Sequence, residues 1–95
     1  MASVVAELTV GIRYQGMLHG GADLNNITET GLYYVLDNVE NTPSDGNIWY
    51  GSPLLVLKCY GWEYVTQLYI SPAYNKIFKR SYVYGDEKWT SWTEF

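Results

Sequence analysis

The sequence predicts a mainly β fold, a small antiparallel β-meander or sandwich with one short helical turn near residues 23–28. Several short segments alternate between apolar and polar residues, which is typical of strands that bury one face. Glycine, proline, asparagine and aspartate separate these segments at short intervals, as turns between strands require. Strands that follow one another this closely pair in antiparallel sheets.

The N-terminal part contains one expected strand, one joint and one helical turn. Residues 7–14 alternate with a period of two, which predicts a strand that can pair with a neighbouring chain. Four glycines make residues 11–22 the expected joint. Asp23 can accept backbone N–H groups at the start of a helical turn, and Gly31 follows the end of that turn.

Five more strands are expected over residues 32–36, 54–60, 63–70, 76–84 and 88–95. A polar loop over residues 37–47 separates the first two, and Gly61 is the expected hairpin turn. Because side chains alternate between the faces of a strand, Tyr64, Leu68 and Ile70 share one face. The strand after them gathers on one side Phe78, Arg80, Tyr82 and Tyr84.

The aromatic content is high for a chain that is long enough for one domain with one core. There are ten Tyr, four Trp and two Phe, against only 17% charged residues. A core of this size cannot enclose so many rings, so some of them must lie half-exposed with their polar atoms in water.

The charge and the cysteine content limit the classes of partner and the cellular compartment that are compatible with the chain. A formal net charge of −4 argues against a nucleic-acid partner, which needs a basic face, and against attraction to an anionic membrane. No apolar run approaches the length of a membrane span, so no membrane insertion is expected. The single cysteine, Cys59, excludes an intramolecular disulfide, and no signal peptide is expected from the residues at the N-terminus. Both features favour folding in a reducing cytosol.

Groups that could carry catalysis are sparse. His19 is the only histidine and lies in the glycine-rich joint, while Cys59 lies in an apolar strand where cysteine behaves as a small hydrophobe. A nucleophilic Cys–His pair is therefore not expected. Most acidic residues fall at turns, caps or chain ends, where solvated carboxylates are the simpler interpretation. We expect no catalytic residue, no metal site and no cofactor, and we do not expect an enzyme.

Four aromatic residues next to turns are the candidate ligand contacts: Trp49, Tyr50, Tyr60 and Trp62. A ring face can stack on the C–H face of a sugar, while nearby amide and phenol groups bind its hydroxyls. The alternative is that each ring closes one end of a small core. The sequence leaves both interpretations open for these four residues.

Trp89 and Trp92 belong to a different pattern. With the intervening threonine and serine, they resemble the Trp-Ser-x-Trp-Ser box of cytokine receptors, in which indoles interleave with arginines of a neighbouring strand. Arg80 can supply such a cation–π partner. We therefore expect a structural clamp made of these three side chains, with Gln67 hydrogen-bonded within the same sheet.

Residues 21–28 read Gly-Ala-Asp-Leu-Asn-Asn-Ile-Thr, and Gly31-Leu32-Tyr33 follows. From about residue 20 the sequence therefore resembles the knob domain of phage tail fibres and R-type pyocin fibres, whose opening is similar to these segments. The likeness continues through Asn41-Thr42-Pro43, Leu54-Leu55-Val56, Gln67-Leu68-Tyr69 and Ile77-Phe78-Lys79-Arg80 to Trp89-Thr90-Ser91-Trp92-Thr93-Glu94. The segment of residues 47–53 is longer and more aromatic than the corresponding part of the family pattern. It is therefore a candidate region for a binding specificity particular to this chain.

The resemblance implies a non-catalytic module on a trimeric host-adhesion fibre. The chain would then divide into a stub that joins the fibre, residues 1–19, and a knob-like β domain, residues 20–95. The expected partners are a host cell-surface glycan or protein and two further copies of the chain, and the expected location is a virion assembled in the bacterial cytoplasm. Motif residues expected to maintain the structure are Asp23, Asn25, Gly31, Gln67, Arg80, Trp89 and Trp92.

Two alternatives to a receptor-binding knob remain open at this point. The first is an architectural spacer or trimerising knob without receptor contact, which would keep Trp49 and Tyr50 in an interface between chains. The second is a carbohydrate-binding module of a cellular protein, which would usually belong to a longer exported chain.

Overall fold

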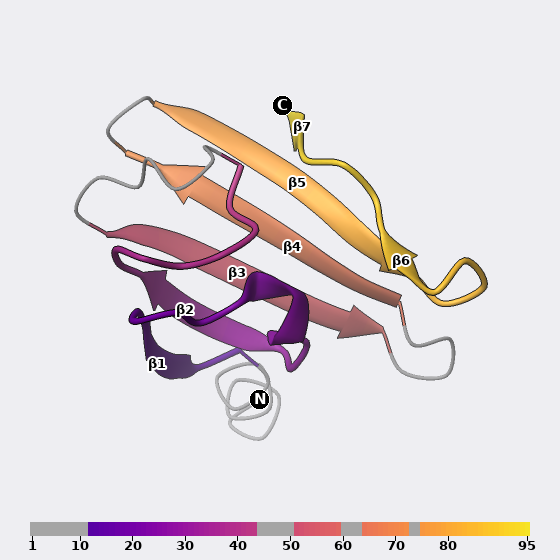
Figure 1. Ribbon diagram of the computed structural model, residues 1–95, viewed down its shortest axis with the longest axis horizontal. Helices are drawn as coiled ribbons and strands as arrows, with labels where there is room; N and C mark the ends of the chain where they lie inside the picture. The colour runs from indigo at the N-terminus through magenta and orange to yellow at the C-terminus, as the bar shows by residue number, and fades with distance from the viewer. Residues whose placement is uncertain (1–11, 44–50, 60–63, 73–74) are drawn as a thin grey trace, which may run out of the picture.

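The computed structural model describes residues 12–43, 51–59, 64–72 and 75–95. Within these ranges the chain forms one open, mixed sheet of seven strands (Figure 1). They are β1 (Tyr14–Leu18), β2 (Gly31–Val35), β3 (Ser52–Cys59), β4 (Tyr64–Ser71), β5 (Lys76–Val83), β6 (Lys88–Trp89) and β7 (Thr93–Glu94). The prediction of a mainly β fold is confirmed, and β2 to β6 form an antiparallel meander in chain order.

Strand β1 departs from the expected organisation. It lies within residues 11–22, which were expected to be a joint, and it pairs in parallel with β2 from Tyr14↔Leu32 to Leu18↔Val35. Gly16 has φ +128° at a shift in the pairing register, so this glycine makes an irregularity inside a strand and not a flexible joint. The expectation of a joint is therefore wrong for residues 14–18. Residues 1–11, with most of the strand expected over 7–14, lie outside the described residues.

A parallel pair needs a long crossover, and residues 19–30 supply it. This crossover contains the expected helical turn, the 3-10 helix η1 (Leu24–Asn26). The Asp23 carboxylate caps it by accepting the backbone N–H of Asn25 at 2.9 Å. Leu24 is fully buried, so the turn anchors the crossover to the sheet.

The C-terminal segment is not the single strand expected over residues 88–95. It forms two short strands, both paired with β5, through Tyr82↔Trp89 on β6 and Phe78↔Glu94 on β7. Between them the chain leaves the regular ladder, because Thr90 bonds Ser81 with both its backbone N–H and its side-chain hydroxyl.

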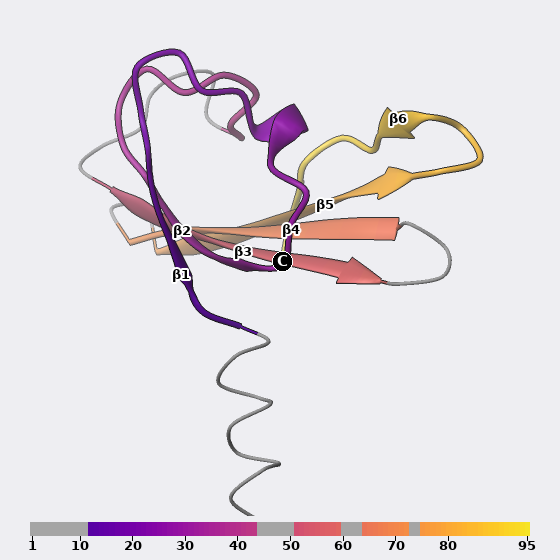
Figure 2. The same ribbon diagram turned by 90° about the horizontal axis from the view of Figure 1, so that it is seen from below.

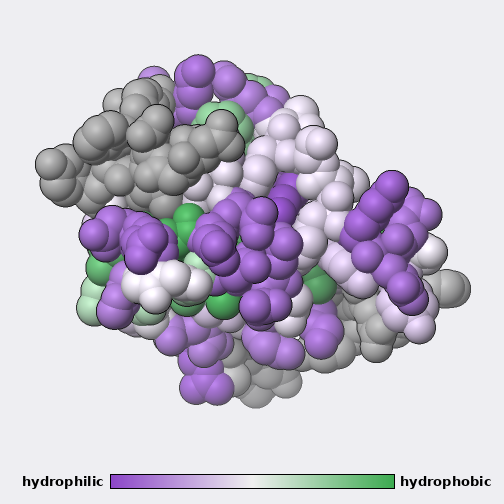
Figure 3. Space-filling view, in the orientation of Figure 1, coloured by the Kyte–Doolittle hydropathy of each residue, from purple (hydrophilic) through white to green (hydrophobic). Residues whose placement is uncertain are grey.

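The two faces of the sheet differ. Figure 2 shows the sheet nearly edge-on, with η1 and the long connections gathered on one side. That covered face holds the core, which consists of Leu24, Tyr33, Val35, Val39, Leu54, Val56, Val65 and Tyr69. The outer surface of this side is mostly hydrophilic (Figure 3).

No described segment covers the opposite, open face. Tyr64, Leu68 and Ile70 share a face of β4 as expected, but it is this open one, while Val65, Gln67 and Tyr69 point into the core. Apolar side chains of neighbouring strands that remain 38% exposed on the open face are Leu32, Tyr34, Leu57 and Ile77. Among the described residues there is no helix long and apolar enough to cross a membrane.

Candidate functional site

The candidate ligand contacts cannot be placed in the fold. Trp49, Tyr50, Tyr60 and Trp62 all lie outside the described residues, so a role in binding stays a prediction for them. The expected structural residues are all described. Six of them meet in one network on the covered face, namely Asp23, Asn25, Gln67, Arg80, Trp89 and Trp92.

Gln67 lies at the centre of this network and is completely buried. Its Nε2 donates to the backbone carbonyls of Leu24, at 2.7 Å, and Ile27, at 2.9 Å. Its Oε1 accepts a hydrogen bond from Nε of Arg80, its cross-strand partner on β5, at 2.9 Å. Both ends of one amide are thus occupied, as a buried glutamine requires, and η1 is tied to the middle of the sheet.

Arg80 lies between two indoles. The guanidinium carbon is 4.2 Å from the ring centroid of Trp89 and 4.8 Å from that of Trp92. Cation–π contacts of this kind gain strength when the cation is removed from water, and Arg80 is only 6% exposed. The sequence anticipates this contact, because a Trp-x-x-Trp segment after an arginine-bearing strand can place both rings beside it.

A break in the C-terminal strand makes the arrangement possible. Residues three apart in a regular strand point to opposite faces, so a continuous strand over residues 88–95 would separate Trp89 from Trp92. Because the chain leaves the ladder after Trp89 and pairs again only at Thr93, both indoles lie on the covered face with Arg80.

Neighbouring rings and a loop hold each indole in place. Trp89 meets Tyr82 edge-to-face, with centroids 5.6 Å apart, and Trp92 meets Tyr69 in the same way at 5.9 Å. The Trp92 Nε1–H donates to the carbonyl of Asn41 at 2.9 Å. These contacts fix both ring planes relative to the sheet.

Asn41 completes the network, although the sequence analysis did not single it out as a site residue. It has φ 65°, a left-handed conformation that asparagine tolerates better than most residues. Its Nδ2 donates to Asp23 at 2.7 Å, and the same carboxylate oxygen caps η1. The signal that could have identified it is the Asn-Thr-Pro segment, which is rich in turn formers.

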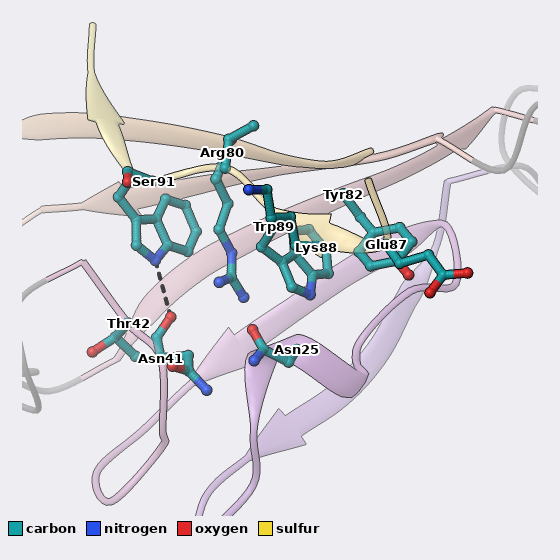
Figure 4. A pocket seen from close by; sticks show the side chains of 11 residues that line it. Asn25, Asn41, Thr42, Arg80, Tyr82, Glu87, Lys88, Trp89 and Ser91 are labelled. Atoms are coloured by element: carbon teal, nitrogen blue, oxygen red, sulfur yellow. Dashed lines mark hydrogen bonds between the residues drawn. The ribbon is translucent and has the colours of Figure 1, made fainter. Parts of the chain in front are cut away.

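A cavity of about 770 Å³ opens beside this network. Figure 4 shows Arg80 reaching from β5 past Trp89 toward Asn25 and Asn41 on the opposite wall. The remaining lining residues are Thr42, Tyr82, Glu87, Lys88, Thr90, Ser91 and Trp92. A mixture of rings, amides, hydroxyls and one buried cation suits the recognition of a polar ligand. The described residues contain no cluster of three or more His, Cys, Asp or Glu side chains that could hold a metal.

Gly31 is explained by the approach of β1 and not by the cavity. A Cβ placed on Gly31 would collide with the side chain of Gln15 and lie 3.1 Å from the carbonyl oxygen of Arg13. That same carbonyl accepts the backbone N–H of Leu32 at 2.9 Å. Glycine therefore allows the segment before β1 to lie close against β2.

Comparison with known proteins gives one structural likeness. No family model matches the sequence, and no curated protein matches it. The fold is similar to a structure of an N-truncated R2-type pyocin tail fibre, with a TM-score of 0.68 and 17% sequence identity. The match covers 85% of this chain and 32% of that fibre, so the chain spans about one third of the fibre's length. The chain therefore has the fold of a tail-fibre segment.

Proposed function

We propose that the chain is a knob domain of a phage tail fibre and serves as a non-catalytic module of host-surface adhesion. The observation that carries the proposal is the tail-fibre-like fold, which extends over 85% of the chain. Six of the seven motif residues that suggested a knob form one connected network, which supports the proposal further. The proposed location is the virion, in a fibre assembled in the bacterial cytoplasm.

The chemistry of the cavity supports binding to a host glycan or a polar protein surface. Half-buried indoles give such a site an apolar margin, while Asn25 and Ser91 offer exposed amide and hydroxyl groups. Further proposed contacts are the aromatic residues near turns, namely Trp49 and Tyr50 before β3 and Tyr60 and Trp62 after it.

The test is binding of the labelled chain to a panel of bacterial strains and to an array of bacterial surface glycans. We expect saturable binding to a subset of strains, and we expect unlabelled chain to compete with it. The heat-unfolded chain is the control for adhesion through exposed hydrophobic surface. If the folded chain binds no strain and no glycan in either its monomeric or its oligomeric form, the adhesion proposal is wrong.

The Trp49→Ala variant tests the proposed contact at Trp49. It is expected to melt at the wild-type temperature and to bind cells more weakly, because an exposed ring contributes contact area to a ligand without supporting the core. The readouts are thermal unfolding followed by circular dichroism and cell binding by flow cytometry. A collapse of stability would instead assign Trp49 to the core.

The open face of the sheet favours a second function, that of an architectural or trimerising knob. Contiguous exposed apolar side chains on a sheet usually mark a contact with another chain. Leu32, Leu57 and Ile77 lie on three different strands of this face and are each 38% exposed. We propose that three copies of the chain associate through it, either together with receptor binding or in place of it.

A further inference from the structure

Arg80 is a buried cation whose hydrogen-bonding capacity is only partly used. Its Nε donates to Gln67, but the buried Nη2 has no hydrogen-bond partner among the described residues. The ion pairs found among the described residues join Lys58 to Glu29 and Lys76 to Glu94. Neither of them involves this guanidinium. A buried charged donor without an acceptor raises the free energy of the folded state, and a bound acceptor would remove that cost.

Among the described residues, Asp23 forms no ion pair with this guanidinium. Asp23 uses one oxygen to accept from Asn25 and Asn41. Burial lowers the pKa of Arg80 to about 10, and the charge of Asp23 opposes this shift. Arg80 therefore stays protonated at neutral pH, and its positive charge faces the cavity between Trp89 and Trp92.

The side chains that line the cavity carry one net positive charge although the chain is acidic, and Asp23 lies outside that lining. Arg80 and Lys88 contribute two positive charges to its lining, and Glu87 contributes one negative charge. The chain as a whole has a formal net charge of −4. Neutral donors and acceptors on Asn25, Thr90 and Ser91 complete the rim, and all three residues are exposed. A local positive site with surrounding amide and hydroxyl groups favours an anion that also carries hydroxyls.

We propose that this cavity binds the anionic group of an acidic sugar unit, such as a hexuronate or a sugar phosphate in a bacterial surface glycan. An oxygen of the anion accepts from the Arg80 guanidinium, whose planar fork suits carboxylate and phosphate oxygens. Lys88 adds attraction at the rim, and the sugar hydroxyls bind the exposed amide and hydroxyl groups. Nη2 is shielded from solvent in the free chain, so a side chain of the cavity lining must rotate to admit the ligand. This inference rests on the proposed adhesion function and names its ligand class.

The test is a titration of ¹⁵N-labelled chain with sodium glucuronate, glucose 6-phosphate and glucose, followed through assigned indole N–H and backbone signals. The signals of Trp89 and Trp92 are expected to shift saturably with one or both acidic sugars, and glucose should bind at least about tenfold more weakly. The stronger of the two acidic ligands identifies carboxylate or phosphate as the preferred anion. Equal binding of glucose and both acidic sugars, or no binding of any of them, overturns the proposal.

Charge variants at the rim test the site without disturbing the buried network. Lys88→Gln should weaken binding of the acidic sugar by up to about fivefold, and Glu87→Gln should strengthen it by a similar factor, since both charges are exposed. Lys79→Gln, on the open face, is the matched control and should leave the affinity unchanged. If all three variants bind like the wild type, the anion does not lie in this cavity.

Cell binding separates this inference from the proposed function. If the chain binds cells, and neither acidic sugar competes, the adhesion function stands and the acidic-sugar site is wrong. If an acidic sugar shifts the cavity signals while no strain and no glycan of the array binds the chain, the site stands and the adhesion function is wrong.

Discussion

Gln67 and Arg80 are polar side chains on a sheet face that is otherwise packed with apolar residues. They are compatible with that face because each supplies a partner to the other, and Gln67 also binds two carbonyls of the crossover. The carbonyl of Ile27 lies just beyond a single helical turn, so it depends on a partner outside that turn. At the residue scale, one amide therefore fixes where η1 rests on the sheet.

Gln67→Leu should lower the free energy of unfolding by about 3 kcal/mol, because it leaves the two carbonyls and Nε of Arg80 buried without this partner. The measurement is urea unfolding followed by tryptophan fluorescence. Thr66→Ala is the matched control on the opposite face of β4, where it removes one partly buried contact with Ser81 and should cost about 1 kcal/mol. Equal losses in both variants would show that the Gln67 network adds nothing specific.

Trp89→Ala should destabilise the domain by about 3 kcal/mol or more, since it removes a ring that packs on Arg80 and on Tyr82. The variant is expected to be largely unfolded at a temperature at which the wild type is folded, as measured by circular dichroism. Trp89→Phe keeps an aromatic face and should retain most of the stability. A melting curve of the alanine variant within a few degrees of wild type would contradict a structural role for this indole.

At the scale of elements, close approach decides how β1 joins the sheet. Its segment lies so near to β2 that Gly31 has no room for a Cβ. Gly31→Ala is expected to loosen β1 and to cost about 1–3 kcal/mol, as overpacking usually does. Hydrogen exchange of residues 14–18 and thermal unfolding measure the two effects. Gly85→Ala is the control, because no atom lies within 4 Å of a Cβ at that position, and loss of protection in both variants would contradict the argument.

The elements that could be predicted from sequence are those whose evidence is local. Alternation and turn residues predict β2 to β5 and η1 to within about two residues. The parallel pairing of β1 could not be predicted, since Gly16 and the glycines on either side of the strand give the same signal as a flexible joint. The break between β6 and β7 was missed for a related reason, because it depends on bonds between Thr90 and Ser81 on a neighbouring strand.

The contacts of the candidate site also divide into those that could be predicted from the sequence and those that could not. The contact of Arg80 with Trp89 and Trp92 was expected from their types and spacing. The hydrogen bonds from Gln67 to Leu24 and Ile27 span 43 and 40 positions, and no periodicity in a single sequence specifies such pairs. The cavity itself follows from these long-range contacts, so it could be found only in the folded chain.

At the scale of the whole molecule, the two faces of the sheet suit different tasks. The covered face carries the core and the polar cavity, and the open face presents apolar side chains from β2, β3 and β5. Short strands at one edge, β6 and β7, offer little backbone for pairing with another sheet. Self-association through the open face would therefore leave the cavity free to bind a ligand.

Replacing Leu57 and Ile77 together by lysine tests this arrangement. We expect the wild-type chain to form a trimer and the double variant to remain a folded monomer, because burying two uncompensated charges in each interface would cost several kcal/mol. Light scattering after size-exclusion chromatography gives the mass, and circular dichroism confirms the fold. Tyr84→Lys, at an exposed position in the turn after β5, is the control and should remain trimeric. A wild type that is monomeric over the whole accessible concentration range would contradict the trimer, whereas a double variant that remains trimeric would place the interface elsewhere.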